Sequence, residues 1–470
     1  MLDEQTTGPD LLPERPPEHS VDALVAGGGM AGASAAATLS AMRWNVLLVE
    51  PGLDPAKRLA GELIHPPGVS DIAELGLLGA VEGAGSASVL GFAVFDDVRA
   101  RPFLLPYGAI PGIERQGYAV DHALLRGRLL ARLRALPHVT TWMHSRVIGL
   151  DLGANDHASV TVTTPHGTRR IRARLVVAAD GAASTLRRLA GIRATRVQLS
   201  RMTGYVVRGT PPYPGYGNVF LGGPAPILAY AIGDDAVRVM FDIPDNPDGL
   251  DAPARNAAYL DALPAGFRER VRQAIASSAR LVSVNATVIP DRVAYGRLVL
   301  VGDAAGSCHP LTATGLSVCT RDALRLRQAL RDTGGDVPRA LARFAHLRGG
   351  PQVTRMALAG ALYDAFAART PEMRLLRDGI LRFWERSARG RAASMALLST
   401  HEGRLSRMAL EYAHVIAYAL TTLVRHHGRV RAPQGVLPSR ASRHRTLWGV
   451  GRATMRHAGR AIKIWRLARA

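Results

Sequence analysis

Glycines near the N-terminus have the spacing that a phosphate-binding turn requires. Positions 27–32 read GGGMAG, which satisfies G-x-G-x-x-G with Gly27, Gly29 and Gly32. The first glycine permits a tight turn, the second lets the backbone approach a pyrophosphate, and the third lets a helix pack closely on a strand. Glu50 follows Gly32 by eighteen residues and is placed to accept hydrogen bonds from a ribose diol. This pattern predicts a dinucleotide site.

The segments around the glycines must supply a strand, a helix and a second strand. Residues 21–26 and 45–49 are apolar runs, and residues 33–37 are mostly alanine. We predict a βαβ unit whose helix begins at the glycines and turns its N-terminal amides toward phosphate. Met30 and Ala31 lie within the glycine loop, and Pro51 follows the acid that ends the second strand.

Two later turns each place an aspartate after an apolar strand. Asp180 follows the run 174–179, and Gly302 with Asp303 follows the run 297–301. The segment 310–317 then opens a helix whose N-terminal amides can stabilise negative charge. A helix-capping role is the structural alternative for both aspartates.

Together these segments resemble the flavoprotein monooxygenases of the para-hydroxybenzoate hydroxylase fold, and within that fold the squalene monooxygenases (squalene epoxidases). The resemblance runs over most of the chain. It is carried by the stretches RLAGELIHPPG at 58–68 and LGL at 75–77, the loop HPLT at 309–312 with Gly315, the strands 218–243, and ALYDAF at 361–366.

The resemblance implies FAD as the cofactor, with Asp303 accepting from ribityl hydroxyls. An arginine on the helix 123–133 is implied as well; Arg126 and Arg128 are both near, and Arg128 is assigned. Phe92 takes the place of the family's active-site tyrosine and is the substrate-cavity candidate; no catalytic residue is assigned. The expected cofactor contacts are Gly27, Gly29, Met30, Ala31, Gly32, Glu50, Pro51, Arg58, Arg128, Val147, Asp180, Gly302, Asp303, Pro310, Gly315 and Leu316.

The implied reaction transfers one oxygen atom from a C4a-hydroperoxyflavin to a lipophilic alkene, an isoprenoid or polyene. Such a transfer needs an apolar cavity and no protein nucleophile. Two alternatives stay open: reduction of double bonds, as in geranylgeranyl reductases, and aromatic hydroxylation, which would add a need for a base near the ring. Tyr107, Tyr118 and His122 are polar candidates that also have a structural interpretation. A halogenase is disfavoured because Lys57 and Lys463 are poorly placed for it.

No second G-x-G-x-x-G occurs, so the sequence predicts no separate NAD(P)H-binding domain. We expect NAD(P)H as the ultimate donor, binding transiently or acting through a reductase partner. Cys308 and Cys319 are the only cysteines, which excludes a disulfide-stapled secreted module. Neither thiol chemistry nor a metal site is expected.

The formal charge of +21 is concentrated near the C-terminus. Residues 401–470 hold fourteen basic residues against Glu402 and Glu411, although the chain as a whole has ordinary globular composition. Trp448, Met455, Ala458, Ile462 and Trp465 recur at helical spacing among arginines, which is typical of a basic amphipathic helix on an anionic membrane. A helix packed on its own domain would show the same stripe.

We expect a peripheral or monotopic protein on the cytoplasmic side of a membrane. The apolar run 408–424 is too short to span, and residues 1–20 match no signal peptide. Nucleic-acid binding is disfavoured, because no recognised motif accompanies the basic tail.

The expected fold class is α/β, with a Rossmann-type FAD-binding domain, an inserted α+β substrate domain and a helical C-terminal region that associates with membranes. We expect a disordered tail at 1–20, the FAD-binding domain at 21–88, 120–190 and 290–335, the substrate domain at 89–119 and 191–289, and the C-terminal region at 336–470. Within that region, Gly349 to Pro351 predicts a break and residues 431–438 a linker.

Overall fold

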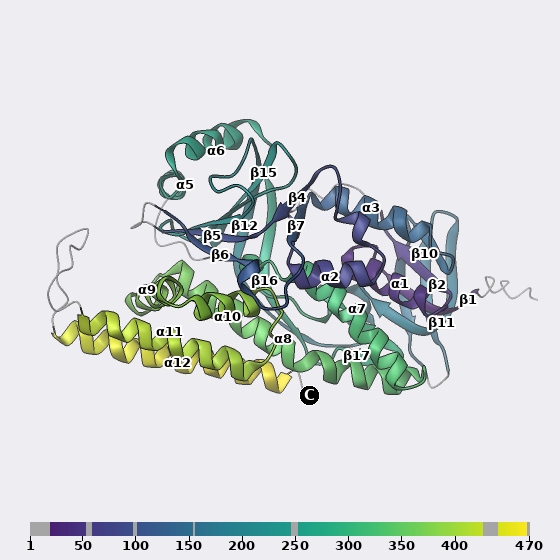
Figure 1. The fold of residues 1–470 in the computed structure, drawn as a ribbon. Helices are drawn as coiled ribbons and strands as arrows, with labels where there is room; N and C mark the ends of the chain where they lie inside the picture. The colour runs from purple at the N-terminus through teal and green to yellow at the C-terminus, as the bar shows by residue number, and fades with distance from the viewer. Residues whose placement is uncertain are drawn as a thin grey trace, which may run out of the picture.

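The computed structural model describes residues 19–52, 59–96, 101–153, 156–245, 252–425 and 440–467. Two large sheets and a group of long helices make up the molecule (Figure 1). The first sheet has the strand order β17-β18-β11-β1-β2-β8, and β10 and β9 continue from β11. Its strands are β1 (His19–Ala26), β2 (Val46–Glu50), β8 (Val139–Met143), β9 (Arg146–Asp151), β10 (Ala158–Thr164), β11 (Gly167–Ala178), β17 (Ala294–Tyr295) and β18 (Leu298–Leu300).

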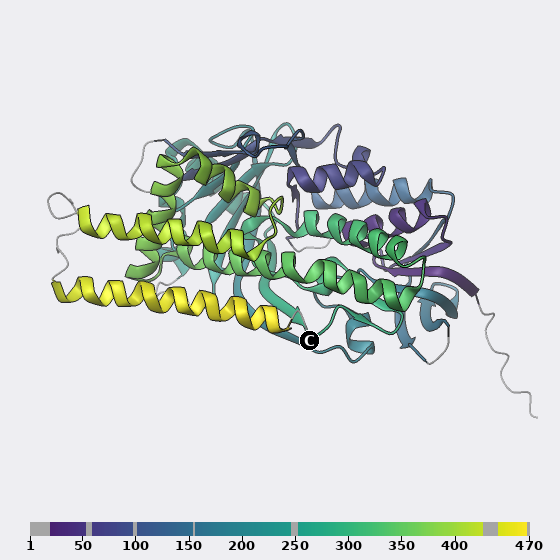
Figure 2. The same cartoon turned by 60° about the horizontal axis from the view of Figure 1, so that its bottom comes forward.

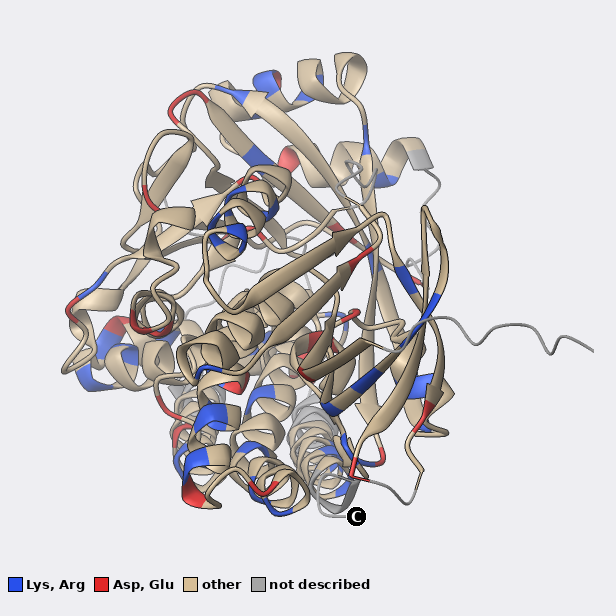
Figure 3. Ribbon diagram, turned by 90° about the vertical axis from the view of Figure 1, so that its right-hand side faces the viewer, with Lys and Arg blue, Asp and Glu red and all other residues tan. Residues whose placement is uncertain are grey.

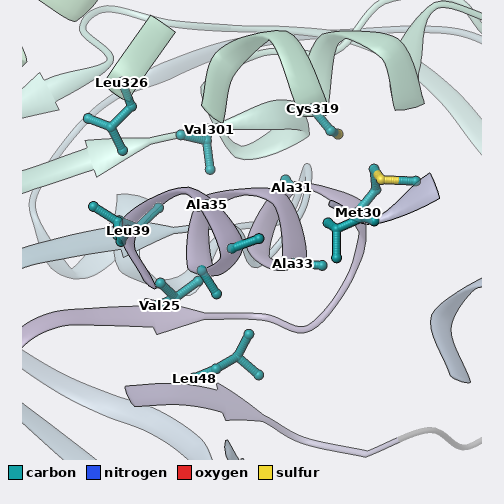
Figure 4. Close-up of a cluster of buried hydrophobic side chains, with 14 of the residues drawn as sticks. Val25, Met30, Ala31, Ala33, Ala35, Leu39, Leu48, Val301, Cys319 and Leu326 are labelled. Atoms are coloured by element: carbon teal, nitrogen blue, oxygen red, sulfur yellow. The ribbon is translucent and has the colours of Figure 1, made fainter. Parts of the chain in front are cut away.

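Parallel pairing in the centre of the first sheet explains its continuous apolar strands. β1 pairs in parallel with β2 and β11, and all five residues of β2 are buried. One face is covered by α1 (Met30–Ala41), α3 (His122–Arg134) and α7 (Gly315–Asp332), with α2 (Pro66–Glu74) packed on α7. The alanines of α1 let it lie close to the sheet and to α7, as Figure 4 shows for Ala31, Ala33 and Ala35 of α1, with Val25 of β1 on one side and Cys319 of α7 on the other.

The second sheet is almost wholly antiparallel and has the order β16-β12-β15-β14-β13-β5-β6. One of its faces packs on α5 (Ala252–Asp261) and α6 (Ala265–Ser277) around Phe220, Tyr259 and Phe267. Its strands are β5 (Gly91–Phe95), β6 (Phe103–Pro106), β12 (Ala194–Arg208), β13 (Gly217–Phe220), β14 (Ile227–Ala231), β15 (Ala236–Pro244) and β16 (Leu281–Pro290). A small third sheet has the order β3-β7-β4, with β3 (Leu63–Ile64), β7 (Gly117–Val120) and β4 (Ser86–Val89). Figure 1 shows β4 and β7 between the two large sheets.

The C-terminal part consists of long helices. They are α8 (Val337–Ala367), α9 (Pro371–Arg386), α10 (Ala388–Leu398), α11 (Leu405–Arg425) and α12 (Arg440–Leu467). Figure 2 shows α8, α11 and α12 running beside one another. The predicted break at Gly349 to Pro351 is wrong, because α8 continues through Pro351, whose ring packs against Gly403. The predicted linker at 431–438 lies outside the described residues.

Candidate functional site

The glycine loop joins β1 to α1 as its spacing predicts. Gly27 has a φ of +107°, and a Cβ at residue 32 would lie 1.7 Å from the Gly27 carbonyl oxygen. At Gly29, in contrast, an added Cβ would meet nothing within 4 Å. No side chain caps α1, and its first turn holds no acid, so the amides of Met30 and Ala31 remain available to an anion.

Glu50 connects the end of β2 to this loop and to α3. Its Oε2 accepts from the Gly28 amide at 2.6 Å, and its Oε1 accepts from the Gly52 amide at 2.9 Å and from Arg126 Nη2 at 3.0 Å. Because the carboxylate is buried, these three donors offset its desolvation. Pro51 follows it and is exposed.

The structure places Arg126, and not Arg128, beside Glu50. Arg128 turns away and donates to the Ser86 hydroxyl and the Ala84 carbonyl oxygen. The two residues lie on different sides of α3. The sequence alone did not indicate which of the two arginines faces Glu50. Arg58 lies outside the described residues. Val147 lies in β9 and is partly buried against the apolar cluster on the face of the first sheet opposite α1.

Asp180 acts locally as a cap. Its Oδ2 accepts from the Thr185 and Leu186 amides at 2.6 and 3.1 Å, at the start of α4 (Thr185–Leu189). Arg187, in that same helix, reaches the other acid turn and donates to the Ala304 carbonyl oxygen at 2.9 Å. Asp180 therefore positions α4, and Arg187 of α4 fixes the loop that carries Asp303.

A buried aspartate that sequence reasoning missed holds the Gly302–Ala305 turn. Asp322 Oδ2 accepts from the Gly302 amide at 3.0 Å and from Arg348 Nε at 2.9 Å. Arg355 Nη2 donates to the Gly306 carbonyl oxygen at 3.0 Å. The available signal was an acid on the apolar side of the amphipathic helix α7. Asp303 itself is exposed on the turn.

His309 anchors the start of the loop that follows. Its Nδ1 accepts from the Leu311 amide at 3.2 Å, so its proton is on Nε2, which donates to Asp242 Oδ1 at 3.1 Å. Its ring stacks on Tyr363 with centroids 4.1 Å apart. Pro310 thus begins its turn from a point fixed on the second sheet, and Gly315 then opens α7 with no side-chain cap.

His65 holds the other end of the same loop. Its Nε2 lies 2.8 Å from the Thr312 carbonyl oxygen, and its Nδ1 lies 2.7 Å from the Tyr107 hydroxyl. Complete burial lowers the pKa of His65 to about 4, so the ring is neutral at neutral pH. Phe92, on β5, has its ring 5.9 Å from that of His65. Nothing in the sequence distinguished His65 from its neighbours.

A buried ion pair links the chain before His65 to the second sheet. Arg238 donates from Nε to Glu62 Oε2 at 2.9 Å and from Nη2 to Glu62 Oε1 at 2.7 Å. Two polar candidates have structural contacts of the same kind: Tyr118 donates to Glu82, and His122 hydrogen-bonds the Gly61 carbonyl oxygen. Neither is placed beside Phe92 by these contacts.

The residues present fit FAD at this site. The open space at Gly29 and the uncapped amides of α1 suit a pyrophosphate, and Glu50 suits a ribose. The uncapped first turn of α7, with Leu316 buried beside Gly61, suits an electron-rich ring.

An apolar cavity of about 70 Å³ lies among the C-terminal helices. Leu362, Ile380, Trp384 and Met408 are among its lining residues. Within the described ranges, no helix is both long and apolar enough to cross a bilayer.

Comparisons with known proteins agree with this geometry. Residues 172–437 match the family model for squalene epoxidase. The chain is 29% identical over 438 residues to squalene epoxidase erg1 of Aspergillus fumigatus, covering 86% of each chain. It is 28% identical to squalene monooxygenase of Mus musculus, covering 81% of this chain and 68% of that protein. The structure of p-nitrophenol 4-monooxygenase PnpA from Pseudomonas putida shares the fold, with a TM-score of 0.65, 19% identity, and coverage of 81% of this chain and 99% of that chain.

Proposed function

The chain belongs to the squalene epoxidase family and is an FAD-dependent monooxygenase, and from this premise we propose that it epoxidises a lipophilic alkene, an isoprenoid or polyene similar to squalene. The first sheet with its helices is the proposed FAD-binding domain, and the second sheet is the proposed substrate domain. The chemistry that FAD supplies when bound is activation of dioxygen by its reduced ring, one oxygen atom passing to the substrate and the other leaving as water.

The observation that carries the choice of epoxidation is the neutral wall around Phe92. His65 stays neutral because burial lowers its pKa to about 4, and burial raises the pKa of Tyr107 well above its ordinary value. His65 is therefore a weak base and Tyr107 stays protonated, so neither of these two neighbours of the Phe92 ring is suited to take a proton from a phenol at neutral pH. Hydroxylation of a phenol would need such a base, whereas an alkene does not.

The surroundings of this wall suit a hydrocarbon. Phe92 belongs to an apolar cluster that includes Leu63, Leu105, Leu228 and Leu311, and that extends to the helices α8, α9 and α10. Burying such a substrate lowers the free energy by about 25 cal/mol per Å² of apolar surface removed from water. It does so without placing a polar group against the hydrocarbon. The charges nearby are paired, because the Glu62 carboxylate accepts from the Arg238 guanidinium.

The proposed cofactor contacts follow the site described above. The amides of Met30 and Ala31 hold the pyrophosphate, and Glu50 with Arg126 holds the ribose. Asp303, on a turn fixed by Asp322, accepts from the ribityl chain. Thr312 to Leu316 lies against the flavin ring and excludes water from it. NAD(P)H is the proposed ultimate electron source, directly or through a reductase partner.

The exposed face of α12 supports a membrane-associated location. Trp448, Met455 and Ile462 lie seven residues apart, and their exposed fractions are 72%, 77% and 51%. Val450 and Ala453, in contrast, are buried against the helices beneath. Four of the five residues of the predicted stripe, Trp448, Met455, Ala458 and Ile462, therefore face away from the domain, and the Trp465 side chain lies outside the described ones. We propose that it lies on an anionic membrane, on the cytoplasmic side.

Charges near this stripe are partly used inside the protein. Arg460 donates to Asp364 at 2.7 Å, and Arg456 lies 3.9 Å from Glu372. Figure 3 shows basic and acidic positions together on the helices in the lower part of the view. The pairing fixes α12 on α8 and α9, so the exposed apolar side chains keep one orientation toward a membrane.

The experiment that tests the proposed function is product analysis with a substrate panel. Detergent-purified protein with FAD, NADPH and a generic reductase would be incubated with squalene, a second polyene and a phenol. We expect an epoxide from the alkenes and no phenol oxidation. A product that has gained two hydrogens would identify a double-bond reductase instead.

A further inference from the structure

His65 and Tyr107 have a single arrangement of protons. The Thr312 carbonyl oxygen can only accept, so His65 Nε2, at 2.8 Å, carries the hydrogen. Its Nδ1 is then a lone pair, and the Tyr107 hydroxyl, at 2.7 Å, must donate to it. The direction of donation runs from Tyr107 through the imidazole to Thr312.

His65 is also bound to the helix that the loop enters. Its backbone amide donates to the Ser317 hydroxyl at 3.2 Å, in the first turn of α7. The side chain and the backbone of one residue thus fix Thr312 and Ser317, which bracket residues 313–316. Close packing maintains the second contact, because a Cβ at Gly68 would lie 2.5 Å from the Ser317 hydroxyl.

The pair lies beside Phe92, the residue that the resemblance places where the family has a tyrosine. The Phe92 ring is 5.9 Å from His65 and 6.2 Å from Tyr107, both centroid to centroid, and Tyr107 is itself edge-on to His65. Phe92, Tyr107 and His65 are 7%, 2% and 0% exposed. The three rings form one buried unit between β5, β6 and the Thr312 loop.

We propose that Tyr107 and His65 are positioning residues that hold the loop 312–317 against the flavin and replace, in this chain, the hydroxyl that Phe92 lacks. This inference rests on the proposed function, because it assigns the loop to the flavin. Tyr107 orients His65, and His65 sets the direction of the Thr312 carbonyl and of the first turn of α7. In this proposal the hydroxyl that performs the positioning is carried by residue 107 and not by residue 92.

The first test is made on the FAD-loaded enzyme without turnover. Nitrogen NMR of the imidazole should show the neutral Nε2–H tautomer of His65 from pH 7 down to pH 5. His65→Leu should change the visible flavin spectrum and shift the flavin potential, whereas His65→Gln should restore both, since its amide offers the same donor and acceptor. His166→Leu, on the exposed turn between β10 and β11, is the matched control. A charged imidazole at pH 7, or a flavin spectrum unchanged in His65→Leu, would overturn the inference.

The second test addresses the exchanged hydroxyl. Tyr107→Phe removes one oxygen atom and leaves the Thr312 contact, so it should fold and should lower kcat about tenfold with little change in KM. Adding Phe92→Tyr should recover most of that loss. Failure of the double variant to recover, in a protein with wild-type thermal stability, contradicts the replacement. The spectral test stands even if no alkene is epoxidised, so it separates this inference from the proposed function.

Discussion

Asp322 Oδ2 accepts the backbone amide of Gly302 at 3.0 Å, and this contact ties α7 to the turn that presents Asp303. The same oxygen accepts from Arg348, and Arg325 lies 3.3 Å from the other oxygen. The carboxylate is fully buried, so its three donors are what makes the charge tolerable there.

Replacing Asp322 should therefore damage both stability and cofactor binding. Asp322→Asn leaves Arg348 buried without its counter-charge, and we expect a loss of about 3–5 kcal/mol in the free energy of unfolding, with a lower flavin-to-protein ratio. Asp332→Asn, in the same helix, removes a half-exposed partner of Arg343 and should cost about 1 kcal/mol or less. Urea unfolding and flavin absorbance measure the two quantities. Equal losses in the two variants would show that Asp322 has no special role.

Gly29 separates cofactor binding from folding. Because an added Cβ there meets nothing within 4 Å, Gly29→Ala should cost the protein without FAD under about 1 kcal/mol. The methyl group occupies the approach of the pyrophosphate, so the Kd for FAD should rise at least about tenfold. Gly32→Ala is the contrasting variant and should fail to fold well. Flavin fluorescence titration gives the Kd, and unchanged affinity in Gly29→Ala would place the pyrophosphate elsewhere.

His65 should make stability depend on pH. Its pKa is about 4 in the folded chain against 6.5 when unfolded, so between these values only the unfolded chain binds the proton. Stability therefore falls as the pH drops through this window. Asp71 has the opposite sign, because burial raises its pKa from 3.8 to about 6 and its contribution is lost as the pH rises.

A comparison of His65→Gln with the wild type isolates the histidine from Asp71. Between pH 7 and pH 4 the variant should gain about 3 kcal/mol in unfolding free energy relative to the wild type. Urea unfolding at each pH gives this difference. Two curves that remain parallel would mean that His65 is already charged in the folded protein.

The exposed stripe on α12 should control membrane binding. Serine at Trp448, Met455 and Ile462 together removes the face available to lipid, and we expect at least about a tenfold loss in partitioning to anionic vesicles. A control variant carries serine at three other exposed apolar positions: Ile148, Val197 and Tyr295. Vesicle sedimentation compares them. Equal binding of both variants would show that the membrane contact does not lie on α12.

The nucleotide loop could be predicted from sequence because glycine spacing and strand periodicity are local. Glu50 could be placed for the same reason, at the end of a strand that begins within the same βαβ unit. Arg126 could not be chosen over Arg128, since a difference of two positions on a helix changes the direction of the side chain and not the pattern.

His65 and Asp322 could not be predicted as site residues for a different reason. Their partners, Thr312 and Gly302, are 247 and 20 positions away, and the contacts exist only after α2 and α7 have packed. Pro351 shows the same limit: its local preference to interrupt a helix is overridden by the packing of α8 against its neighbours.

The central claim, oxygen transfer to an alkene, is tested most directly with labelled dioxygen. The FAD-loaded enzyme with NADPH, a reductase and squalene would be incubated under ¹⁸O₂, and the product examined by mass spectrometry. We predict an epoxide that carries one labelled oxygen atom, with the second label in water. A product that has gained two hydrogens and no label, or an epoxide whose oxygen comes from water, would contradict the claim.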